Sequence, residues 1–206
     1  LNDRRILSDL AASAGAADGK AEMGVLISLD KLDKIGEDGV TKELLSKGFA
    51  PEAIATLWEN LTAQAGDEAT LSWLEGRLGE RGKAGVATLR QVREAAFALG
   101  VPPERLKVDP TLARGLDYYT GPVFETVVDE PKVGSISGGG RYDGLIGMFS
   151  GKDVPAVGVS LGLERIIAVM EELSMSSAAP TAADVLITVF NPELSGGSLA
   201  ASRALR

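Results

Sequence analysis

One short stretch of the sequence brings together residue types that bind phosphates and polar ligands. Residues 114–121 contain Arg114, Asp117, Tyr118 and Tyr119. An arginine there could hold a phosphate or a carboxylate through two parallel hydrogen bonds, and tyrosine hydroxyls could orient a polar ligand. A structural interpretation is also open, in which Arg114 and Asp117 form an ion pair and both tyrosines lie in the core.

A second segment, residues 138–144, is rich in glycine and contains Gly139, Gly140, Arg141 and Tyr142. Glycine lets a backbone approach a phosphate, but the segment lacks the glycine spacing of dinucleotide-binding loops and the Gly-Lys-Ser/Thr ending of P-loops. Neither of these nucleotide sites is supported. A bare hairpin or bulge would explain the glycines without any ligand.

Residues 158–162 match the Gly-x-Ser-x-Gly pattern that holds a nucleophilic serine in α/β-hydrolases. Ser160 would need a base to take its proton, and the chain contains no histidine. We therefore interpret Gly158 and Gly162 as positions where the backbone comes close to a ligand or a neighbouring strand. Arg165 opens the helix expected next and could hold an anion together with backbone N–H groups; a surface arginine is the alternative.

The charge pattern supports nucleic-acid binding only weakly. The formal net charge of −8 argues against a chain built to coat nucleic acid. A modest basic cluster is interleaved with glutamates: Arg77, Arg81, Lys83, Arg90 and Arg93. Such a run is typical of a solvated helix face, and a weak tRNA-facing surface is the alternative.

Composition narrows the chemistry further. With 206 residues, of which 45% are hydrophobic and 24% charged, the chain can bury the core of one domain and carry an appendage. The absence of cysteine and histidine excludes disulfides, zinc sites and Ser-His-Asp triads, and we expect no haem or flavin. No apolar run approaches the roughly 18 residues of a membrane span and no secretion signal opens the chain, so we expect a cytoplasmic protein without a membrane partner.

The spacing of apolar residues predicts a helical region in the first half of the chain. From about residue 37 to 100 the pattern is helical, with apolar stripes at 54–61, after Pro51, and at 89–99. The short apolar run at 24–29 is compatible with either a buried strand or a helical turn.

Strands are predicted after the prolines at 102 and 103. Residues 123–128 and 134–137 are expected to form an antiparallel hairpin, and residues 155–161 a further strand. An amphipathic helix is predicted over 166–173, and residues 184–190 resemble the first strand of another domain.

Taken in order, three segments resemble the histidyl-tRNA synthetases. Residues 114–119 resemble the first histidine-specific signature of that family, residues 139–143 the second, and residues 158–165 motif 3 of the class II synthetases. Residues 1–5 and 30–34 are similar to the segment that follows motif 2, so the resemblance covers nearly the whole chain.

The resemblance implies an α+β fold: a partial class II antiparallel sheet with a helical insertion and the start of a C-terminal α/β domain, in a homodimeric protein. The expected domains are a catalytic-core segment at 1–35, a helical insertion at 36–100, catalytic core with the signatures and motif 3 at 101–176, a linker at 177–183 and the start of an anticodon-binding domain at 184–206.

The implied activity is that of a histidine–tRNA ligase, which converts histidine and ATP, supplied with Mg²⁺ as substrate, to histidyl-adenylate and then charges tRNA(His). By resemblance, Arg114 is the catalytic arginine on the α-phosphate of ATP, and Gly162 and Arg165 also bind ATP. Histidine is assigned, on the same basis, to Tyr118, Tyr119, Tyr142, Gly139 and Gly140. No protein-bound metal is expected.

Motifs 1 and 2 of the family have no counterpart in the sequence, which begins and ends in what read as interrupted helices. We therefore expect a fragment that neither activates histidine nor dimerises normally by itself. The competing hypothesis is a regulatory module, related to the synthetases, that binds histidine or uncharged tRNA without ligase activity. The presence of Arg114 and Tyr119 favours the enzyme, because a module released from adenylate formation would need neither.

Overall fold

Helices make up most of the first half of the chain, as predicted. The computed structural model describes residues 1–62, 64–113, 118–175 and 185–205, in two units, Leu1–Ile166 and Ile167–Arg206. The helices of this half are α1 (Arg4–Ser13), α2 (Gly19–Leu29), α3 (Leu32–Ser46), α4 (Pro51–Leu61), α5 (Asp67–Glu75) and α6 (Glu80–Ala98), and the short 3₁₀ helix η1 (Pro103–Arg105) follows them.

Local signals explain where several helices begin. Asp3 and Asp18 precede α1 and α2, and their side chains accept hydrogen bonds from the backbone N–H groups of Arg5 and Ala21. Pro51 opens α4, where its missing N–H costs nothing. The ambiguous run at 24–29 is therefore helical, since it lies within α2.

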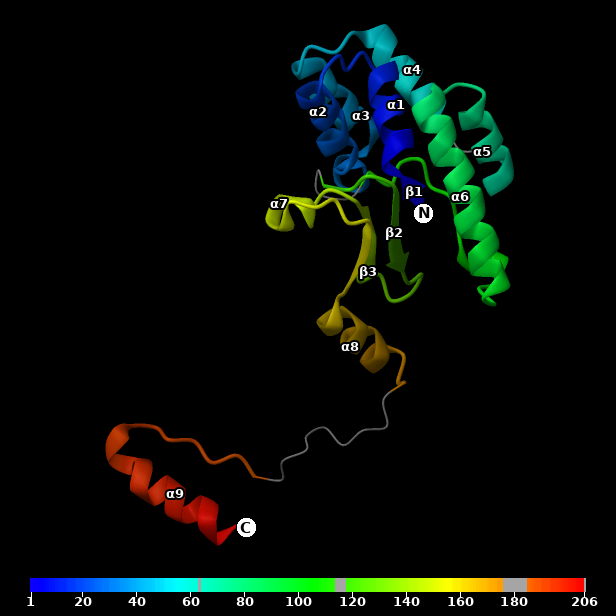
Figure 1. Ribbon diagram of the computed structural model, residues 1–206. Helices are drawn as coiled ribbons and strands as arrows, with labels where there is room; N and C mark the ends of the chain where they lie inside the picture. Colours follow the sequence, from blue (N-terminus) through cyan, green and yellow to red (C-terminus); the bar gives the residue numbers. More distant parts are fainter. Residues whose placement is uncertain (63, 114–117, 176–184, 206) are drawn as a thin grey trace. The chain divides into compact units, whose positions relative to one another are not determined.

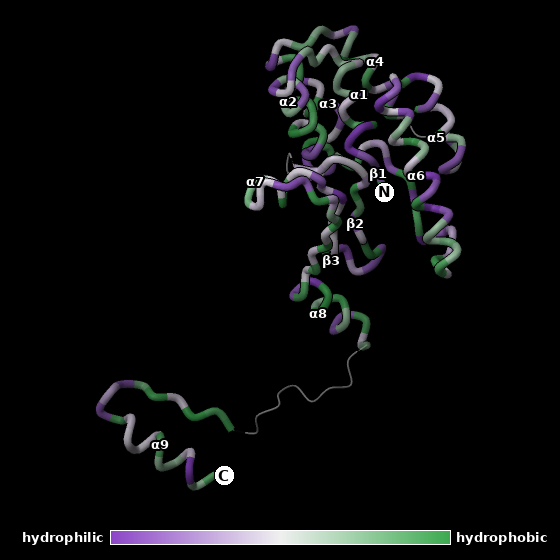
Figure 2. Tube along the Cα trace, in the orientation of Figure 1, coloured by the Kyte–Doolittle hydropathy of each residue, from purple (hydrophilic) through white to green (hydrophobic). Residues whose placement is uncertain are grey.

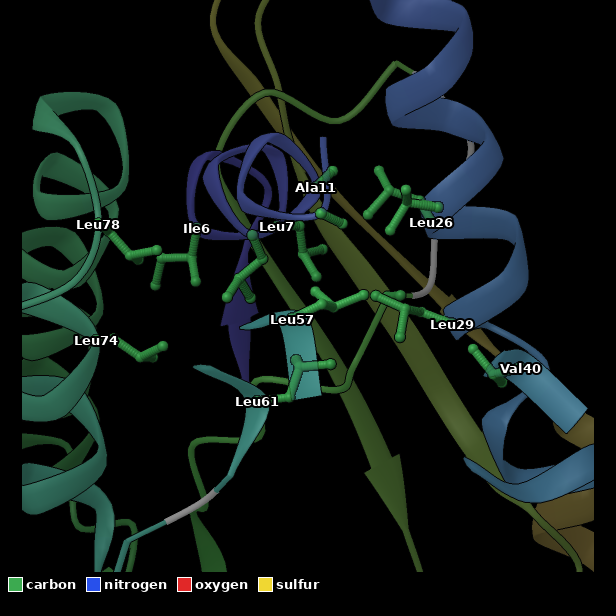
Figure 3. Close-up of a cluster of buried hydrophobic side chains, with 14 of the residues drawn as sticks. Ile6, Leu7, Ala11, Leu26, Leu29, Val40, Leu57, Leu61, Leu74 and Leu78 are labelled. Atoms are coloured by element: carbon green, nitrogen blue, oxygen red, sulfur yellow. The ribbon is translucent and has the colours of Figure 1, made fainter. Parts of the chain in front are cut away.

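A hydrophobic core joins these helices. α1 packs against α2, α4 and α6, and its Ile6 and Leu7 are fully buried. Figure 3 shows Ile6 on the side of Leu74 and Leu78, and Leu26 on the opposite side of α1. Figure 2 shows hydrophobic and hydrophilic stretches following one another along the same helices. α1 thus packs on α4 and α6, although the sequence places it in a different expected domain; the domain boundaries stay a prediction.

The apolar stripe predicted at 89–99 is only partly buried. Leu89 has no exposed surface, whereas Leu99 is 86% exposed. The buried positions of α6 cluster in its first half, at Gly82, Gly85, Val86 and Leu89. The second half of α6 therefore extends past the core that its periodicity led us to expect.

The sheet is antiparallel throughout, in the order β1 (Asn2–Asp3), β2 (Pro122–Val127), β3 (Ser135–Tyr142), β4 (Ala156–Leu161). The predicted hairpin and the strand after it are confirmed, and so is the α+β class. Figure 1 shows α1 to α5 above β2 and β3, with β1 between these helices and the sheet. The sequence predicted that the chain opens inside a helix. This prediction is wrong, because β1 precedes α1.

The length of β3 and the edge position of β4 were not predicted from the sequence. β3 is longer than predicted because the glycine-rich residues 138–140 continue the strand, so they form neither a hairpin turn nor a bulge. β4 is an edge strand among the described residues, and its alternate residues Val157, Val159 and Leu161 are exposed. The short helix α7 (Gly147–Ser150) lies between β3 and β4 in the sequence.

The predicted amphipathic helix is α8 (Leu163–Glu172), which spans the boundary between the units. In the second unit, η2 (Pro192–Leu194) and α9 (Ser195–Ala204) follow residues 185–190. The strand predicted at 184–190 is wrong for the described residues 185–190, which have no regular structure. Strand propensity needs a neighbouring strand to accept its hydrogen bonds, and the Thr188 carbonyl accepts one from the Ser198 hydroxyl instead, at 3.0 Å. The predicted linker at 177–183 lies outside the described residues.

No helix in the described part of the chain is long and apolar enough to cross a membrane.

Candidate ligand-binding site

A cavity of about 290 Å³ lies on the sheet of the first unit. Four of the residues expected to bind ligands line it: Tyr119, Gly139, Gly162 and Arg165. The other lining residues are Leu112, Val123, Phe124, Glu125, Ser135, Ile136, Ser137, Gly138 and Ser160. The cavity therefore brings together three segments of the sequence, at 112–125, 135–139 and 160–165.

Strand register decides which side chains share a face. Gly140 is the partner of Val123 on β2 and of Gly158 on β4, and Gly138 is the partner of Glu125 and Ser160. Because paired residues point to the same side of a sheet, this face carries a glycine-lined surface with one carboxylate and one hydroxyl. A side chain at Gly138 would narrow the cavity, which this glycine lines.

Three tyrosines gather beside this surface. The ring centroids of Tyr118 and Tyr119 are 4.6 Å apart, those of Tyr118 and Tyr142 5.5 Å, and those of Tyr119 and Tyr142 6.3 Å. Burial, followed by a hydrogen bond with its neighbour Tyr118 that favours the protonated phenol, raises the pKa of Tyr119 to about 12. The Tyr119 hydroxyl is protonated at neutral pH, as in an ordinary tyrosine, and brings no charge to the cavity.

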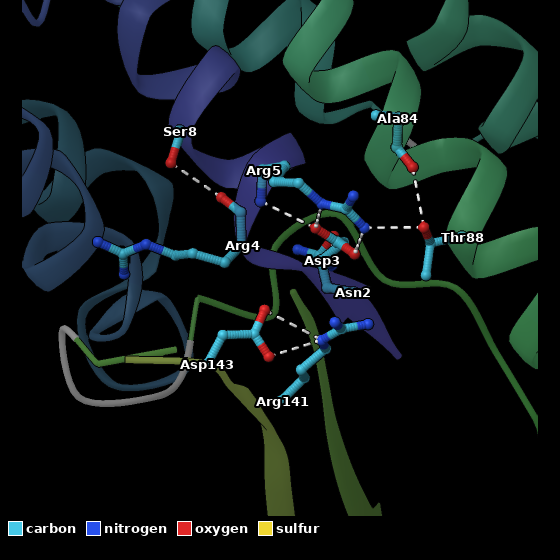
Figure 4. Close-up of polar contacts among 9 residues, drawn as sticks. All are labelled: Asn2, Asp3, Arg4, Arg5, Ser8, Ala84, Thr88, Arg141 and Asp143. Atoms are coloured by element: carbon cyan, nitrogen blue, oxygen red, sulfur yellow. Dashed lines mark hydrogen bonds and ion pairs between the residues drawn. The ribbon is translucent and has the colours of Figure 1, made fainter. Parts of the chain in front are cut away.

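Backbone and side-chain bonds fix the tyrosine segment to the end of β3. The N–H of Thr120 donates to the Arg141 carbonyl at 2.9 Å, and the N–H of Asp143 donates to the Thr120 hydroxyl at 3.1 Å. Arg141 itself donates through Nε to Asp143 Oδ1, at 2.9 Å (Figure 4). Residues 118–120 and 141–143, predicted separately as parts of two signatures, are thus one structural unit.

Arg165 lies at the edge of the cavity, at the start of α8. Its Nη1 donates to the carbonyl of Ser135 at 2.7 Å, and the N–H of Gly162 donates to the carbonyl of Ile136 at 2.8 Å. These two bonds hold the beginning of α8 against the beginning of β3. They place a positive charge and a helix N-terminus beside the cavity, an arrangement suited to an anion.

The remaining predicted site residues either lie outside the described residues or do not line the cavity. Arg114 and Asp117 lie outside the described residues, so neither the phosphate-binding interpretation nor the ion pair is tested. Among the described residues, Tyr118, Tyr142 and Gly140 are close to the cavity through Tyr119 but do not line it.

Sequence reasoning missed three polar residues in the cavity wall, Glu125, Ser135 and Ser137. The signal for Glu125 was its position in β2, two residues after the buried Val123, which puts its carboxylate on the same face. A single charged residue inside an apolar strand is worth attention for that reason. In the part of the chain that is described, no group of three or more acidic, histidine or cysteine side chains forms a metal site.

The basic cluster on α6 and in the turn before it is largely neutralised by acidic neighbours. Arg90 pairs with Glu68 and Glu75, both at 2.8 Å. Further pairs are Arg77–Glu59, Arg81–Glu22, Lys83–Glu80, Arg93–Asp67 and Arg93–Glu68. This pairing fits the solvated helix face better than a surface for tRNA phosphates.

Comparison with known proteins gives consistent matches. A family model described as histidyl-tRNA synthetase matches residues 2–166. The histidine–tRNA ligase of Aeropyrum pernix is 39% identical over 215 residues, covering 100% of this chain and 46% of that protein. The histidine–tRNA ligase of Rhodopirellula baltica is 40% identical over 195 residues, covering 93% of this chain and 44% of that protein. The chain thus spans about half the length of these relatives.

Solved structures agree with the sequence matches. The crystal structure of histidyl-tRNA synthetase from Nostoc sp. PCC 7120 matches with a TM-score of 0.78 and 33% identity, covering 100% of this chain and 49% of that one. An ATP phosphoribosyltransferase regulatory subunit/histidyl-tRNA synthetase from Bacillus halodurans C matches with a TM-score of 0.65 and 22% identity, covering 82% and 43%. The second match concerns the fold alone.

Proposed function

Because this chain belongs to the histidyl-tRNA synthetase family, we propose that it forms part of a histidine–tRNA ligase. The proposed reaction joins histidine to ATP as histidyl-adenylate, releases pyrophosphate and transfers the histidyl group to tRNA(His). The observation that carries the proposal is the cavity on the glycine-lined face of the sheet, with tyrosines at one side and Arg165 at another.

In this proposal the tyrosines bind histidine. Tyr119 lines the cavity, and Tyr118 and Tyr142 lie against its ring. A protonated phenol donates a hydrogen bond without adding charge, so it can orient an imidazole or an amino acid head group. Gly139 and Gly140 belong to the same binding region, as the family resemblance implies.

The opposite side of the cavity is proposed to hold ATP, which enters with its Mg²⁺ as substrate. Arg165 supplies a fixed positive charge there, and Gly162 lets the chain pass close to the phosphates at the start of α8. Arg114 is proposed, by resemblance, to hold the α-phosphate, where negative charge grows as the histidine carboxylate attacks. A guanidinium in that role stabilises the transition state without transferring a proton.

The homodimer, the contacts with tRNA(His) and the cytoplasmic location are parts of the same proposal and come from the resemblance and the sequence. We also propose that the 206-residue chain is inactive by itself, because it spans about half the length of the ligases it matches.

The proposal is tested by histidine-dependent ATP–pyrophosphate exchange in a protein of the relatives' full length that carries this chain. We expect exchange with histidine only, and the Arg114→Ala variant should lose about 2.7–4 kcal/mol of transition-state stabilisation. Arg81→Ala is the matched control, since its guanidinium is exposed and 3.9 Å from Glu22.

Three results would contradict parts of the proposal. Exchange by the isolated chain would remove the claim that it is inactive alone. Undiminished exchange in the Arg114→Ala variant would remove the role of Arg114. Absence of exchange in the full-length protein, with binding of histidine or uncharged tRNA, would identify a regulatory relative instead of a ligase.

A further inference from the structure

Two glycines that are partners across β3 and β4 lie under two tyrosine rings. Gly140 and Gly158 face each other in the register. A Cβ atom on Gly158 would lie 2.6 Å from the hydroxyl oxygen of Tyr142 and 3.1 Å from its Cε1. A Cβ atom on Gly140 would lie 2.8 Å from Cε1 of Tyr119. The space that both side chains would need is thus filled by the protein's own aromatic rings.

Gly138 gives the contrast on the same face of β3. Its Cβ would meet only the carbonyl oxygen of Phe124, at 3.5 Å, an ordinary contact. No side chain of the described residues fills the space above it, and Gly138 lines the cavity. The glycines of this face are therefore of two kinds: one borders the open cavity, and the pair Gly140–Gly158 makes room for rings.

The position of Tyr142 depends on this room. Its ring stands edge-on to Tyr118, at 5.5 Å between centroids, and 6.3 Å from the Tyr119 ring. A tyrosine has two side-chain torsions, so a ring pushed away from Gly158 must turn about one of them, and its hydroxyl then moves relative to the other two phenols. Of the two glycines, Gly158 isolates this effect, because a Cβ on Gly140 would also meet the Pro122 backbone oxygen at 2.7 Å.

We propose that Gly158 is a positioning residue of the histidine pocket. Because Gly158 has no side chain, the Tyr142 ring can lie directly over it, and this position determines where the Tyr142 hydroxyl contacts the substrate. The inference rests on the proposed function in naming histidine as the ligand. It gives Gly158, in the Gly-x-Ser-x-Gly segment, a packing role that acts on substrate binding.

A double-mutant cycle tests the proposal in the full-length protein. Gly158→Ala, Tyr142→Phe and the double variant are compared by ATP–pyrophosphate exchange, with Gly144→Ala as control because nothing lies within 4 Å of its would-be Cβ. We expect Gly158→Ala to lower kcat/KM for histidine on the order of a hundredfold, as a misplacement of about 1 Å can. The KM for histidine should carry most of the loss, and the KM for ATP should change little.

Removal of the Tyr142 hydroxyl should relieve the clash, so Gly158→Ala should cost much less in the Tyr142→Phe background. Equal losses in both backgrounds, or equal rises in the two KM values, would overturn the proposal. Urea unfolding of the same four proteins provides a readout that does not depend on ligase activity. If the parent does not exchange with histidine, the proposed function fails, and the unfolding cycle still decides whether Gly158 seats the ring. If Gly158→Ala does not fold, folding of the double variant would support the claim that the Tyr142 ring needs the space over Gly158. Failure of the double variant to fold would overturn the claim.

Discussion

Tyr119 combines a place in the cavity wall with a proton that it releases only at high pH. Burial and the neighbouring phenol of Tyr118 raise its pKa to about 12, from the ordinary 10.0. Between these values the unfolded chain gives up the proton before the folded chain does. The folded state then binds more protons, so the stability of the fold falls as the pH rises from 10 towards 12.

We expect Tyr119→Phe to remove this part of the alkaline sensitivity. The difference in free energy of unfolding between wild type and variant, measured in urea at about pH 8 and about pH 11, should shift in favour of the variant at the higher pH. Ultraviolet titration of the phenols should show that the variant lacks a phenol that ionises near pH 12. A difference in stability that is the same at both pH values would show that Tyr119 ionises as it does in the unfolded chain.

At this scale the sequence placed several residues at the cavity, but it did not predict what their side chains contact. Tyr119, Gly162 and Arg165 reach the cavity as expected. The Tyr142 ring above Gly158 could not be predicted, because the placement of β3 beside β4 depends on strand register. Glu125 was missed although its position two residues after Val123 in β2 indicated which face it lies on. The ligand-binding roles of these residues stay predictions.

The helices depend on close approach as much as on helix propensity. On α6, a Cβ on Gly85 would lie 2.9 Å from Cγ1 of the buried Ile6 and 3.2 Å from the Asp3 carboxylate, so this glycine lets α6 approach α1. On α2, a Cβ on Gly24 would meet only the aliphatic chain of Lys47, at 3.8 Å. The same residue type is therefore required at one position and replaceable at the other.

Opposite effects are expected when each of these glycines is changed to alanine. Gly24→Ala should stabilise the chain by about 1 kcal/mol, since alanine favours the helix. Gly85→Ala should destabilise it by about 1–3 kcal/mol, because overpacking against Ile6 outweighs that gain. Urea unfolding measures both. Stabilisation by Gly85→Ala would mean that α6 moves away from α1 without cost.

Elements with local signals were predicted well, and elements that depend on partners were not. Pro51 and the stripe behind it indicated α4, and β-branched residues indicated β2 and β4. The glycine-rich half of β3 has little strand propensity and is extended because β2 and β4 pair with it on both sides. Residues 185–190 have the propensity but no such neighbours among the described residues.

In the first unit as a whole, a buried polar network at β1 joins the helices to the sheet. The Asp3 carboxylate, fully buried, accepts from Nε and Nη2 of Arg5 at 2.9 and 2.8 Å, and Arg5 Nη2 also donates to Thr88 on α6 at 2.8 Å (Figure 4). The side chain of Asn2 donates to the carbonyls of Pro110 and Leu112, both at 3.1 Å. Two residues of β1 thus fix α1, α6 and the segment that leads to the tyrosines.

Asp3→Ala should destabilise the unit by about 3 kcal/mol, because it leaves the Arg5 guanidinium without its carboxylate in a largely buried place. The matched control is Glu59→Ala, which removes an exposed partner of Arg77 and should change stability by at most about 0.5 kcal/mol. Chemical denaturation compares the two. A similar small change in both variants would show that the network adds nothing beyond a surface ion pair.

The position of β4, at the edge of the sheet among the described residues, bears on the solubility of this chain. The sequence of β4, Ala-Val-Gly-Val-Ser-Leu, has no charged residue and no proline, and its valines and Leu161 face outward. Proteins usually protect an edge strand with lysines, prolines or a covering helix or loop, because an exposed edge strand can pair with strands of other chains. We therefore expect the exposed edge of β4, rather than the well-packed helices, to limit the solubility of this chain.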